Sequence, residues 1–335
     1  MKVLHYIASK VWGGAEKSFT ELCNSLSNNM DIIVVLPFEN KIDSKLDSRI
    51  KVYHISNASR YSPLVYIQLL KIIKSNSPDI IHTHSAKASE IVYYLNKFID
   101  FIQIATKRNT RKGKVFNKIK YVTAISKATK NSIDNDNVAL IYNGVIRYPI
   151  EKYIKRCEEF SLLAIGGLDK IKGFDILIKE VSKLDIPFRL DIVGDGVEKK
   201  SLQNLINTLN LSDKVKLLGY REDIPSLISA SSVVIISSYS EGFSRVVVES
   251  LFYGNLLIST KVGLSIEVLP NELLIEHNYI ADKLIHIYQN QEFYDKLFDS
   301  LKEQYANHFE LKNNINQYIE FYKKVLSSET DKEII

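Results

Sequence analysis

The sequence predicts an α/β protein made of two doubly wound domains, each with a parallel sheet covered by helices. Three observations lead to this class. Short runs rich in Val and Ile alternate with stretches of helical period, the alternation restarts near residue 160, and 335 residues suit two domains of ordinary size. A composition of 45% hydrophobic and 25% charged residues excludes disordered, collagen-like and low-complexity classes.

The first half of the chain supplies seven expected strands. Apolar runs of strand length occupy residues 2–8, 31–36, 51–55, 79–81, 101–105, 120–124 and 138–142. Stretches of helical period such as 15–27 and 64–75 lie between them. Residues 1–147 are therefore expected to form one Rossmann-like domain, and residues 148–158, which hold Pro149 and charges without a period, a linker.

The second half repeats this alternation. Strands are expected at 160–165, 188–193, 215–218, 233–236 and 256–259, helices at 174–183, 198–209, 279–290, 292–305 and 311–326. This pattern predicts a second domain over 159–310, followed by a C-terminal helix and tail in 311–335 that cross back to the first domain. Two such domains facing each other would place a ligand pocket in the cleft between them.

The cysteines and the hydropathy of the sequence indicate the cellular compartment of the protein. Cys23 and Cys157 are far apart and outside metal-ligand spacing, so neither a disulfide framework nor a zinc site is supported. No apolar run approaches the 18 or so residues of a membrane span, and the apolar residues 3–8 are too few for a signal peptide. We therefore expect a cytoplasmic protein.

Positive charge is concentrated in one segment. The net charge is +5, yet nine of the basic residues and no acidic residue lie between Asp100 and Asp134. Lys107, Arg108, Arg111 and Lys112 belong to this segment and are expected to contact a phosphorylated acceptor or an anionic membrane face. A solvated basic loop is the alternative. Nucleic acid is disfavoured because no known reader motif accompanies the charge.

Two groups in the first half could carry chemistry. Gly13 and Gly14 follow the first strand and open a helix, where backbone amides can approach a phosphate, although a tight turn would need the same residues. The spacing differs from a dinucleotide-binding loop. His82 and His84 end a strand on one face, either near the cleft or as a structural pair, and no third metal ligand is evident.

Three groups in the second half suit a diphosphate and a sugar. Lys172 lies in a polar loop between a strand end and a helix start, where it could be a fixed cation or simply solvated. Gly194 ends another strand. Glu241 and Glu249 are about two helical turns apart and could reach different hydroxyls of one extended ligand, whereas two unrelated surface glutamates are the alternative.

Taken together, these segments resemble family 4 of the retaining, nucleotide-sugar-dependent glycosyltransferases with the GT-B fold. The resemblance covers about residues 1 to 325, and the segments follow the family's order: WGGAE (12–16), IIHTHS (80–85), ISK (125–127), NGV (143–145), KGFD (172–175), VGDG (193–196), LLGY (217–220) and EGFSRVVVE (241–249). Residues 241–249, with the upstream KG, are the most specific part.

The resemblance implies a role for each residue. Glu241 would contact the donor sugar and Glu249 the ribose, while the backbone of Gly242, Phe243 and Ser244 would contact the sugar and phosphates. Lys172 would neutralise the diphosphate, His84 would lie beside the transferred sugar, Gly13 and Gly14 would approach the diphosphate or acceptor, and Gly194 and Tyr220 would face the base. Glu241, Lys172 and His84 are the expected catalytic residues, without metal or cofactor.

Two positions depart from the family pattern. Gly167 stands where an Arg usually shares the diphosphate charge, and Lys170 is a candidate substitute. Leu264 follows Gly263 where a second glycine is usual, although Glu267 is kept.

The resemblance implies sugar transfer with retention from a nucleotide diphosphate sugar, with a UDP-sugar as the expected donor, to a lipid-linked or lipopolysaccharide glycan in cell-surface polysaccharide synthesis. Peripheral contact with the inner face of the cytoplasmic membrane is expected. A nucleotide-sugar 2-epimerase and a catalytically silent sugar-nucleotide-binding protein are the alternatives.

Overall fold

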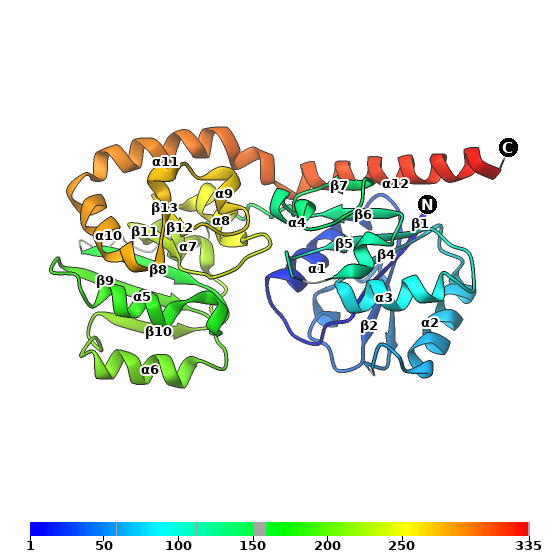
Figure 1. Cartoon of the computed structure of the whole chain (residues 1–335), viewed down its shortest axis with the longest axis horizontal. Coiled ribbons are helices and arrows are strands. Elements are labelled where there is room, and N and C mark those ends of the chain that lie inside the picture. Colours follow the sequence, from blue (N-terminus) through cyan, green and yellow to red (C-terminus); the bar gives the residue numbers. More distant parts are fainter. Residues whose placement is uncertain (58, 112, 151–158, 334–335) are drawn as a thin grey trace. The chain divides into compact units, whose positions relative to one another are not determined.

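The computed structural model describes residues 1–57, 59–111, 113–150 and 159–333 (Figure 1). The chain divides into two compact units. Unit 1 comprises Met1–Ile146 and Phe309–Ile335, and unit 2 comprises Arg147–His308. The predicted first domain ends at residue 147 and the predicted second domain at residue 310, each within two residues of these bounds. Most of the expected linker, residues 151–158, and Cys157 lie outside the described residues.

Unit 1 contains a seven-stranded parallel sheet in the order β3-β2-β1-β4-β5-β6-β7. Its strands are β1 (Lys2–Ile7), β2 (Asp31–Pro37), β3 (Lys51–Ile55), β4 (Ile80–His84), β5 (Gln103–Lys107), β6 (Tyr121–Ala124) and β7 (Val138–Leu140). Its helices are α1 (Gly14–Leu26), α2 (Pro63–Asn76), α3 (Ala86–Leu95), α4 (Lys127–Asn131) and α12 (Leu311–Glu333), with 3-10 turns η1 (Asp43–Lys45) and η2 (Lys114–Asn117).

Two apolar layers cover the sheet of unit 1. Phe19 of α1 and Tyr322 of α12 share one buried cluster with Val34 of β2. Leu69 of α2 and Ile91 of α3 share another with Leu4 of β1. The C-terminal helix α12 is therefore part of the core of unit 1, although 162 residues of unit 2 separate it in sequence from the rest of that unit.

Unit 2 contains a six-stranded parallel sheet in the order β10-β9-β8-β11-β12-β13. Its strands are β8 (Phe160–Ile165), β9 (Phe188–Val193), β10 (Val215–Gly219), β11 (Val233–Ile236), β12 (Leu257–Thr260) and β13 (Leu274–Ile275). Its helices are α5 (Phe174–Val181), α6 (Lys199–Thr208), α7 (Ile224–Ala230), α8 (Arg245–Tyr253), α9 (Ser265–Val268), α10 (Ile280–Gln289) and α11 (Gln291–Tyr305). The 3-10 turns are η3 (Lys170–Lys172), η4 (Asn271–Leu273), η5 (His277–Tyr279) and η6 (Ala306–Phe309), which ends in unit 1.

The expected fold class is confirmed, because both sheets are parallel and doubly wound. No helix of the described residues is both long and apolar enough to cross a membrane.

Candidate functional site

The expected donor-binding residues of unit 2 gather at one edge of its sheet. Because β8, β9, β10 and β11 are parallel, the segments that follow them lie along the same carboxyl edge. Lys172 follows β8, Gly194 follows β9, Tyr220 follows β10 and Glu241 follows β11. The fold thus brings together residues that are far apart in sequence.

Lys172 and Glu241 form an ion pair at this edge. Lys172 Nζ lies 2.6 Å from Glu241 Oε1, and Ser238 Oγ donates to the same oxygen at 2.8 Å. The side chains of Lys172 and Glu241 keep 24% and 13% of their surface exposed, so the pair is shielded yet reachable. A charge-assisted hydrogen bond in such a setting is stronger than one in water. A cation and a carboxylate are therefore fixed side by side.

Close approach between loops holds Lys172 in place. Gly173 has φ +64°, and a Cβ there would lie 2.2 Å from the carbonyl oxygen of Ser237. Ser237 Oγ donates to the carbonyl of Lys172 at 2.8 Å, and the amide of Tyr239 donates to that of Ile171 at 2.8 Å. Glycine is required at 173 because any side chain would separate the loop after β8 from the loop after β11.

Glycines also join the loops after β8, β9 and β12. A Cβ on Gly194, which has φ +141°, would lie 1.9 Å from the carbonyl oxygen of Gly166. A Cβ on Gly263, which has φ +48°, would lie 3.0 Å from Glu241 Cβ. The backbone of Gly263 therefore lies against the glutamate of the ion pair, while Gly194 fixes the start of the loop that carries Lys172.

Helix α8 presents its N-terminus next to Glu241 in sequence. Ser244 is the N-cap residue and makes no side-chain capping bond, and its carbonyl accepts a hydrogen bond from the backbone N–H of Val247 at 3.2 Å, so the positive end of the helix dipole lies here. Phe243 and Ser244 are buried, and Gly242 is half-buried. Glu249 lies farther along α8, where its Oε1 is 3.6 Å from Nη2 of Arg245. Sequence reasoning missed Arg245, because a basic residue beside an acidic one on a helix is common on protein surfaces.

The remaining expected residues of unit 2 are more exposed. Tyr220 is 60% exposed at the end of β10. Lys170 is exposed on η3, and Gly167 is exposed with its nearest neighbour atom 3.8 Å from an added Cβ. A Cβ at 167 would therefore meet no close neighbour.

In unit 1, Gly13 and Gly14 are exposed at the start of α1. Gly13 is the N-cap residue of that helix and has extended backbone, with φ −159°. The side chain of Glu16, in the first turn, is buried and accepts a hydrogen bond from Ser9 Oγ at 2.7 Å. An acidic group thus already lies near the amides that were expected to face phosphate.

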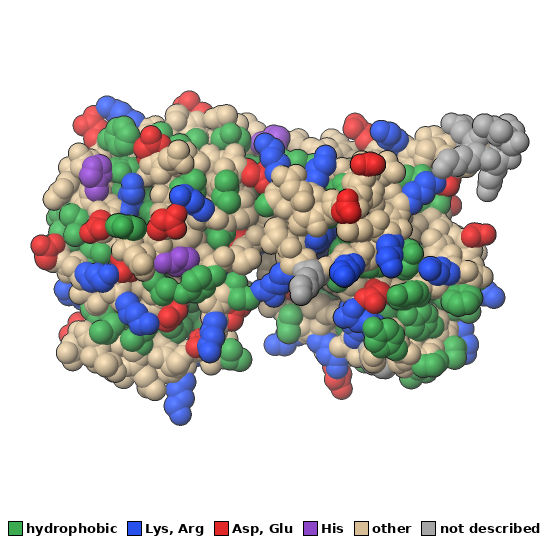
Figure 2. All heavy atoms as spheres, viewed as in Figure 1, with side chains coloured by type: hydrophobic (Ala, Val, Ile, Leu, Met, Phe, Trp, Pro, Cys, Tyr) green, Lys and Arg blue, Asp and Glu red, His purple; other side chains and the backbone are tan. Residues whose placement is uncertain are grey.

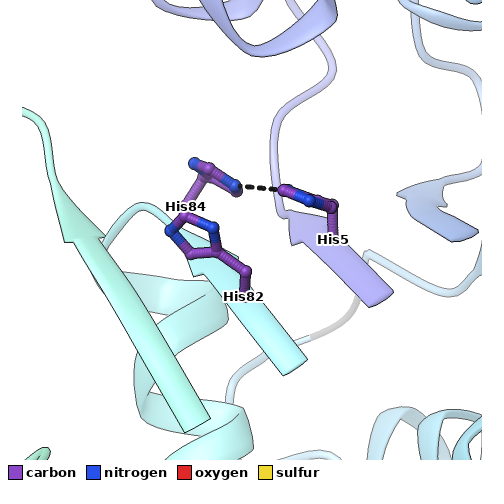
Figure 3. A group of neighbouring side chains, drawn as sticks. All are labelled: His5, His82 and His84. Carbon is purple, nitrogen blue, oxygen red and sulfur yellow. Dashed lines mark hydrogen bonds between the residues drawn. The ribbon is translucent and has the colours of Figure 1, made fainter. Parts of the chain in front are cut away.

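His82 and His84 point to the same face of β4, as expected, but they lie inside unit 1. Strand β4 extends through His84, three residues beyond its expected end, and both rings have no exposed surface. His5 of β1, opposite His82 in the parallel register, completes a group of three histidines whose ligand atoms lie within 4.8 Å of one another (Figure 3). The expectation that no third candidate ligand exists is therefore wrong. Sequence reasoning missed His5 because the pairing of β1 with β4 brings it close.

Hydrogen bonds determine the protonation of two of these rings. Arg108 Nη2 donates to His84 Nδ1 at 3.0 Å, so Nε2 of a neutral His84 carries the proton and donates to His5 Nδ1, also at 3.0 Å. Burial and the charge of Arg108 lower the pKa of His5 to about 3. Burial, together with neighbouring charges that include Arg108, lowers the pKa of His82 and of His84 as well.

The third ring is bonded at both nitrogens. His82 Nδ1 lies 2.6 Å from Tyr322 Oη of α12, and its Nε2 lies 2.6 Å from Thr106 Oγ1 of β5. A divalent cation among the three histidines would have to break such bonds beside the guanidinium of Arg108. We therefore assign the group a structural role: it ties β1, β4, β5 and α12 together and positions Arg108.

Arg108 is the residue of this group that reaches the sheet edge, because it directly follows β5. Its Nη1 lies 3.4 Å from Asn143 Oδ1, and its Nε is buried without a hydrogen-bond partner among the described residues. His84 has both ring nitrogens bonded inside unit 1. Its expected contact with the transferred sugar stays a prediction.

The basic segment differs from its expected form. Lys107 is buried, its Nζ donates to the carbonyl and the Oγ of Ser132 at 2.9 and 2.8 Å, and burial lowers its pKa. The expectation that Lys107 faces an acceptor or membrane is therefore wrong, because its ammonium group is already hydrogen-bonded inside unit 1. Arg111 is exposed, and Lys112 lies outside the described residues.

Comparisons with known proteins agree with the fold of each unit. Residues 12–146 match the family described as Glycosyltransferase Family 4, and residues 150–307 match the family described as Glycosyl transferases group 1. An uncharacterized glycosyltransferase of Methanocaldococcus jannaschii is 31% identical over 259 residues, which cover 69% of this chain and 72% of that protein. The chain belongs to the group 1 glycosyltransferases.

Further similarities to this glycosyltransferase come from one relative and one solved structure. The lipopolysaccharide core biosynthesis glycosyltransferase LpsE of Rhizobium meliloti is 24% identical over 279 residues, or 78% of this chain and 79% of that protein. The crystal structure of Anabaena HepE in complex with UDP-glucose has a TM-score of 0.83 at 21% identity, and covers 98% of this chain and 100% of that chain. This second similarity shows that the glycosyltransferase has the GT-B fold.

Proposed function

We propose that this glycosyltransferase transfers a sugar, with retention, from a UDP-sugar to a hydroxyl of a glycan acceptor that is lipid-linked or part of a lipopolysaccharide. The observation that carries the proposal is the Lys172–Glu241 pair at the carboxyl edge of unit 2, with Glu249 farther along the helix that starts just after Glu241. HepE binds UDP-glucose and LpsE acts in lipopolysaccharide core biosynthesis, which supports this choice of donor and acceptor.

The chemical step needs charge stabilisation more than covalent catalysis. The bond between the anomeric carbon and the diphosphate breaks, and a bond from the acceptor oxygen to that carbon forms on the same face. The proton of the acceptor hydroxyl passes to the departing phosphate oxygen. Lys172 and the first N–H groups of α8 would stabilise the negative charge on the diphosphate as it leaves.

Glutamates would select the donor. Glu241, held by Lys172 and Ser238, would accept hydrogen bonds from sugar hydroxyls, and Glu249 from the ribose. When a donor diphosphate approaches Lys172, the lysine would be shared between the phosphate and Glu241. The donor would therefore orient the carboxylate as it binds.

This proposal requires no metal for catalysis, because Lys172 and the backbone N–H groups supply the positive charge. Turnover in the presence of EDTA should equal turnover without it. Loss of activity with EDTA and recovery with magnesium or manganese would contradict the role given to Lys172.

The central experiment combines calorimetry with a transfer assay. UDP should bind the wild-type protein, and Glu249→Ala should weaken binding about 10- to 150-fold, as expected for a lost charged hydrogen bond of about 1.5 to 3 kcal/mol. Lys172→Ala should abolish transfer. Lys261→Ala is the matched control, because it removes an exposed lysine of the same unit that pairs with Glu276.

Other outcomes would select the alternatives. Conversion of the nucleotide sugar without any acceptor would indicate a 2-epimerase. Donor binding without transfer or hydrolysis, over a panel of glycan acceptors, would indicate a catalytically silent binding protein. Unchanged affinity of Glu249→Ala would remove this residue from the site.

A further inference from the structure

Unit 1 exposes a group of large apolar side chains on α2 and α3 and just beyond their ends. Tyr61 is 74% exposed, Leu64 51%, Ile67 51%, Tyr94 39% and Phe98 83%. We call this group the α2–α3 surface. Figure 2 shows hydrophobic side chains gathered over these two helices, with Lys and Arg side chains next to them.

Folding of unit 1 does not account for this surface. The inner face of α2 is formed by Val65, Leu69, Ile72, Ile73 and Asn76, which are buried. Its outer face follows the same helical period at Leu64, Ile67, Lys71 and Lys74, all exposed. Single exposed apolar residues are ordinary, but an apolar patch on an outer helix face usually marks a contact with another surface.

Residues around Tyr66 join the two helices of this surface. Tyr66, between Leu64 and Ile67 in sequence, donates from its hydroxyl to the carbonyl of Arg60 at 2.9 Å. Burial raises the pKa of Tyr66, and Glu90, Tyr94 and Tyr61 raise it further through their charges. Helices α2 and α3 contact each other and share one apolar cluster, so their exposed side chains belong to one side of unit 1.

Basic residues surround the patch. Residues 60–78 contain Arg60, Lys71 and Lys74 and no acidic residue. Lys97 Nζ lies 5.1 Å from the ring centre of Tyr93 and 5.9 Å from that of Tyr94. Of the nearby carboxylates, Glu90 pairs with Arg60, Asp79 accepts a hydrogen bond from the backbone amide of Lys2 at 2.7 Å, and Asp100 is exposed two residues after Phe98.

The basic segment that the sequence singled out borders the same patch. Helix η2 packs against α3 and carries Lys114, with Lys118 directly after it, and both are exposed. The apolar residues Phe116 and Ile119 of this segment are buried in unit 1, so these two side chains do not contact a membrane. The segment supplies charge, and α2 and α3 supply the exposed apolar side chains.

We propose that the α2–α3 surface docks on an anionic lipid bilayer, with Leu64, Ile67 and Phe98 entering the interface and the surrounding lysines contacting the headgroups. Tyrosines suit the interfacial depth, and lysines extend their charged ends to lipid phosphates. Two copies joined through this face would bring like charges together, which argues against self-association. The inference deepens the proposed function, on which it rests for the reason to approach a membrane.

Vesicle co-sedimentation of the full chain tests the proposal. The wild-type protein should bind vesicles of phosphatidylglycerol and phosphatidylcholine at low salt and should not bind phosphatidylcholine alone. Leu64→Gln and Ile67→Gln should each weaken binding about tenfold. Lys71→Gln and Lys74→Gln should each weaken it about fivefold, with a smaller effect at high salt.

Matched controls separate this surface from a general effect. Val197→Gln with Phe293→Gln removes two exposed apolar side chains from unit 2 and should leave vesicle binding unchanged. UDP affinity of every variant, measured by calorimetry, should equal that of the wild type. If the wild-type protein does not bind UDP, the result contradicts the proposed function. The vesicle assay would still test the α2–α3 surface independently.

Three outcomes would overturn the proposal. The first is equal binding of the L64Q/I67Q variant and the wild type to anionic vesicles. The second is failure of the wild type to bind them at low salt. The third is a wild-type dimer that L64Q/I67Q dissociates without any vesicle binding, because this would assign the surface to a second copy of the chain.

Discussion

The side chain of Lys172 lies against Gly166, since a Cβ built on this glycine would be 3.2 Å from Lys172 Cε and 3.3 Å from Cδ. The backbone at Gly166 therefore forms a wall along the methylenes that lead to Nζ. The position of the ammonium group depends on the absence of a side chain at 166.

Gly166→Ala should move Lys172 Nζ away from Glu241 and lower kcat/KM about tenfold, or roughly 1.4 kcal/mol of transition-state stabilisation. Gly167→Ala is the matched control, because its added Cβ would meet nothing closer than 3.8 Å. Steady-state transfer rates of the two variants provide the measurement. If both variants retain wild-type kinetics, the placement of Lys172 along Gly166 does not matter for transfer.

Two other glycines separate backbone strain from steric overlap. Gly219→Ala has φ +70° but no atom within 4 Å of the added Cβ, so it should destabilise unit 2 by about 1–2 kcal/mol through the left-handed backbone alone. Gly194→Ala adds an overlap with the carbonyl oxygen of Gly166 and should cost more, at least about 3 kcal/mol. Hydrogen exchange of the β8 and β9 amides measures the difference, and equal protection in both variants would contradict it.

Stability of unit 1 should fall in acid. His5, His82 and His84 are buried, and the pKa of His5 is lowered from 6.5 to about 3. Below pH 6.5 the unfolded chain binds protons that the folded unit does not, so the contribution is fully present above pH 6.5 and is lost as the pH falls toward 3. Each histidine that stays neutral should cost about 1.4 kcal/mol per pH unit in that window.

Trp12 provides the measurement for this pH dependence. It is the one tryptophan of the sequence and packs against the apolar cluster of α1 and α12. Its fluorescence should report a lower unfolding midpoint in urea at acid pH, and His5→Leu should reduce the slope with pH. A midpoint that is constant from about pH 7 to pH 5 would show that the rings are not neutral in the folded unit.

Loss of the Arg108–His84 hydrogen bond should weaken binding of the glycan acceptor more than binding of the UDP-sugar. Arg108→Met is expected to raise KM for an anionic acceptor about tenfold, since a charged hydrogen bond is worth about 1.5–3 kcal/mol. His84→Phe removes the ring nitrogen Nδ1, to which Arg108 donates its hydrogen bond. This variant should raise KM for the glycan acceptor less than Arg108→Met does. UDP affinity should stay constant in both, as in Arg49→Met, which removes an exposed arginine of unit 1 paired with Asp47. A change in UDP affinity in Arg108→Met would instead show that Arg108 acts on binding of the UDP-sugar.

Much of the fold could be predicted from the sequence, because both faces of a doubly wound sheet are buried and most of its strands are rich in apolar residues. The bounds of β3, β8, β9 and β11 agree with the prediction. Strand β4 runs to His84 instead of ending at residue 81. Its end was missed because a pattern of apolar residues does not show that histidines can lie in a buried strand when their ring nitrogens are hydrogen-bonded. Strand β13 has two residues, too few for a periodic signal.

The candidate site was less predictable where it depends on pairing between distant strands. Lys172 and Glu241 could be named from their local segments, but their contact arises from the loops after β8 and β11. His5 carries no local signal and joins His84 through the β1–β4 register. Lys107 and Arg108 are adjacent basic residues, yet the first is hydrogen-bonded to Ser132 and the second to His84, and no local pattern in the sequence indicates either partner.

Helix α12 also fixes an order of events during synthesis. Tyr318, Tyr322 and Val325 complete the apolar cluster of unit 1, yet they follow the whole of unit 2 in sequence and leave the ribosome after it. Unit 2 is continuous in sequence and is made before them, so it can reach its native structure first. The sheet of unit 1 therefore stays incompletely covered until α12 has also left the ribosome.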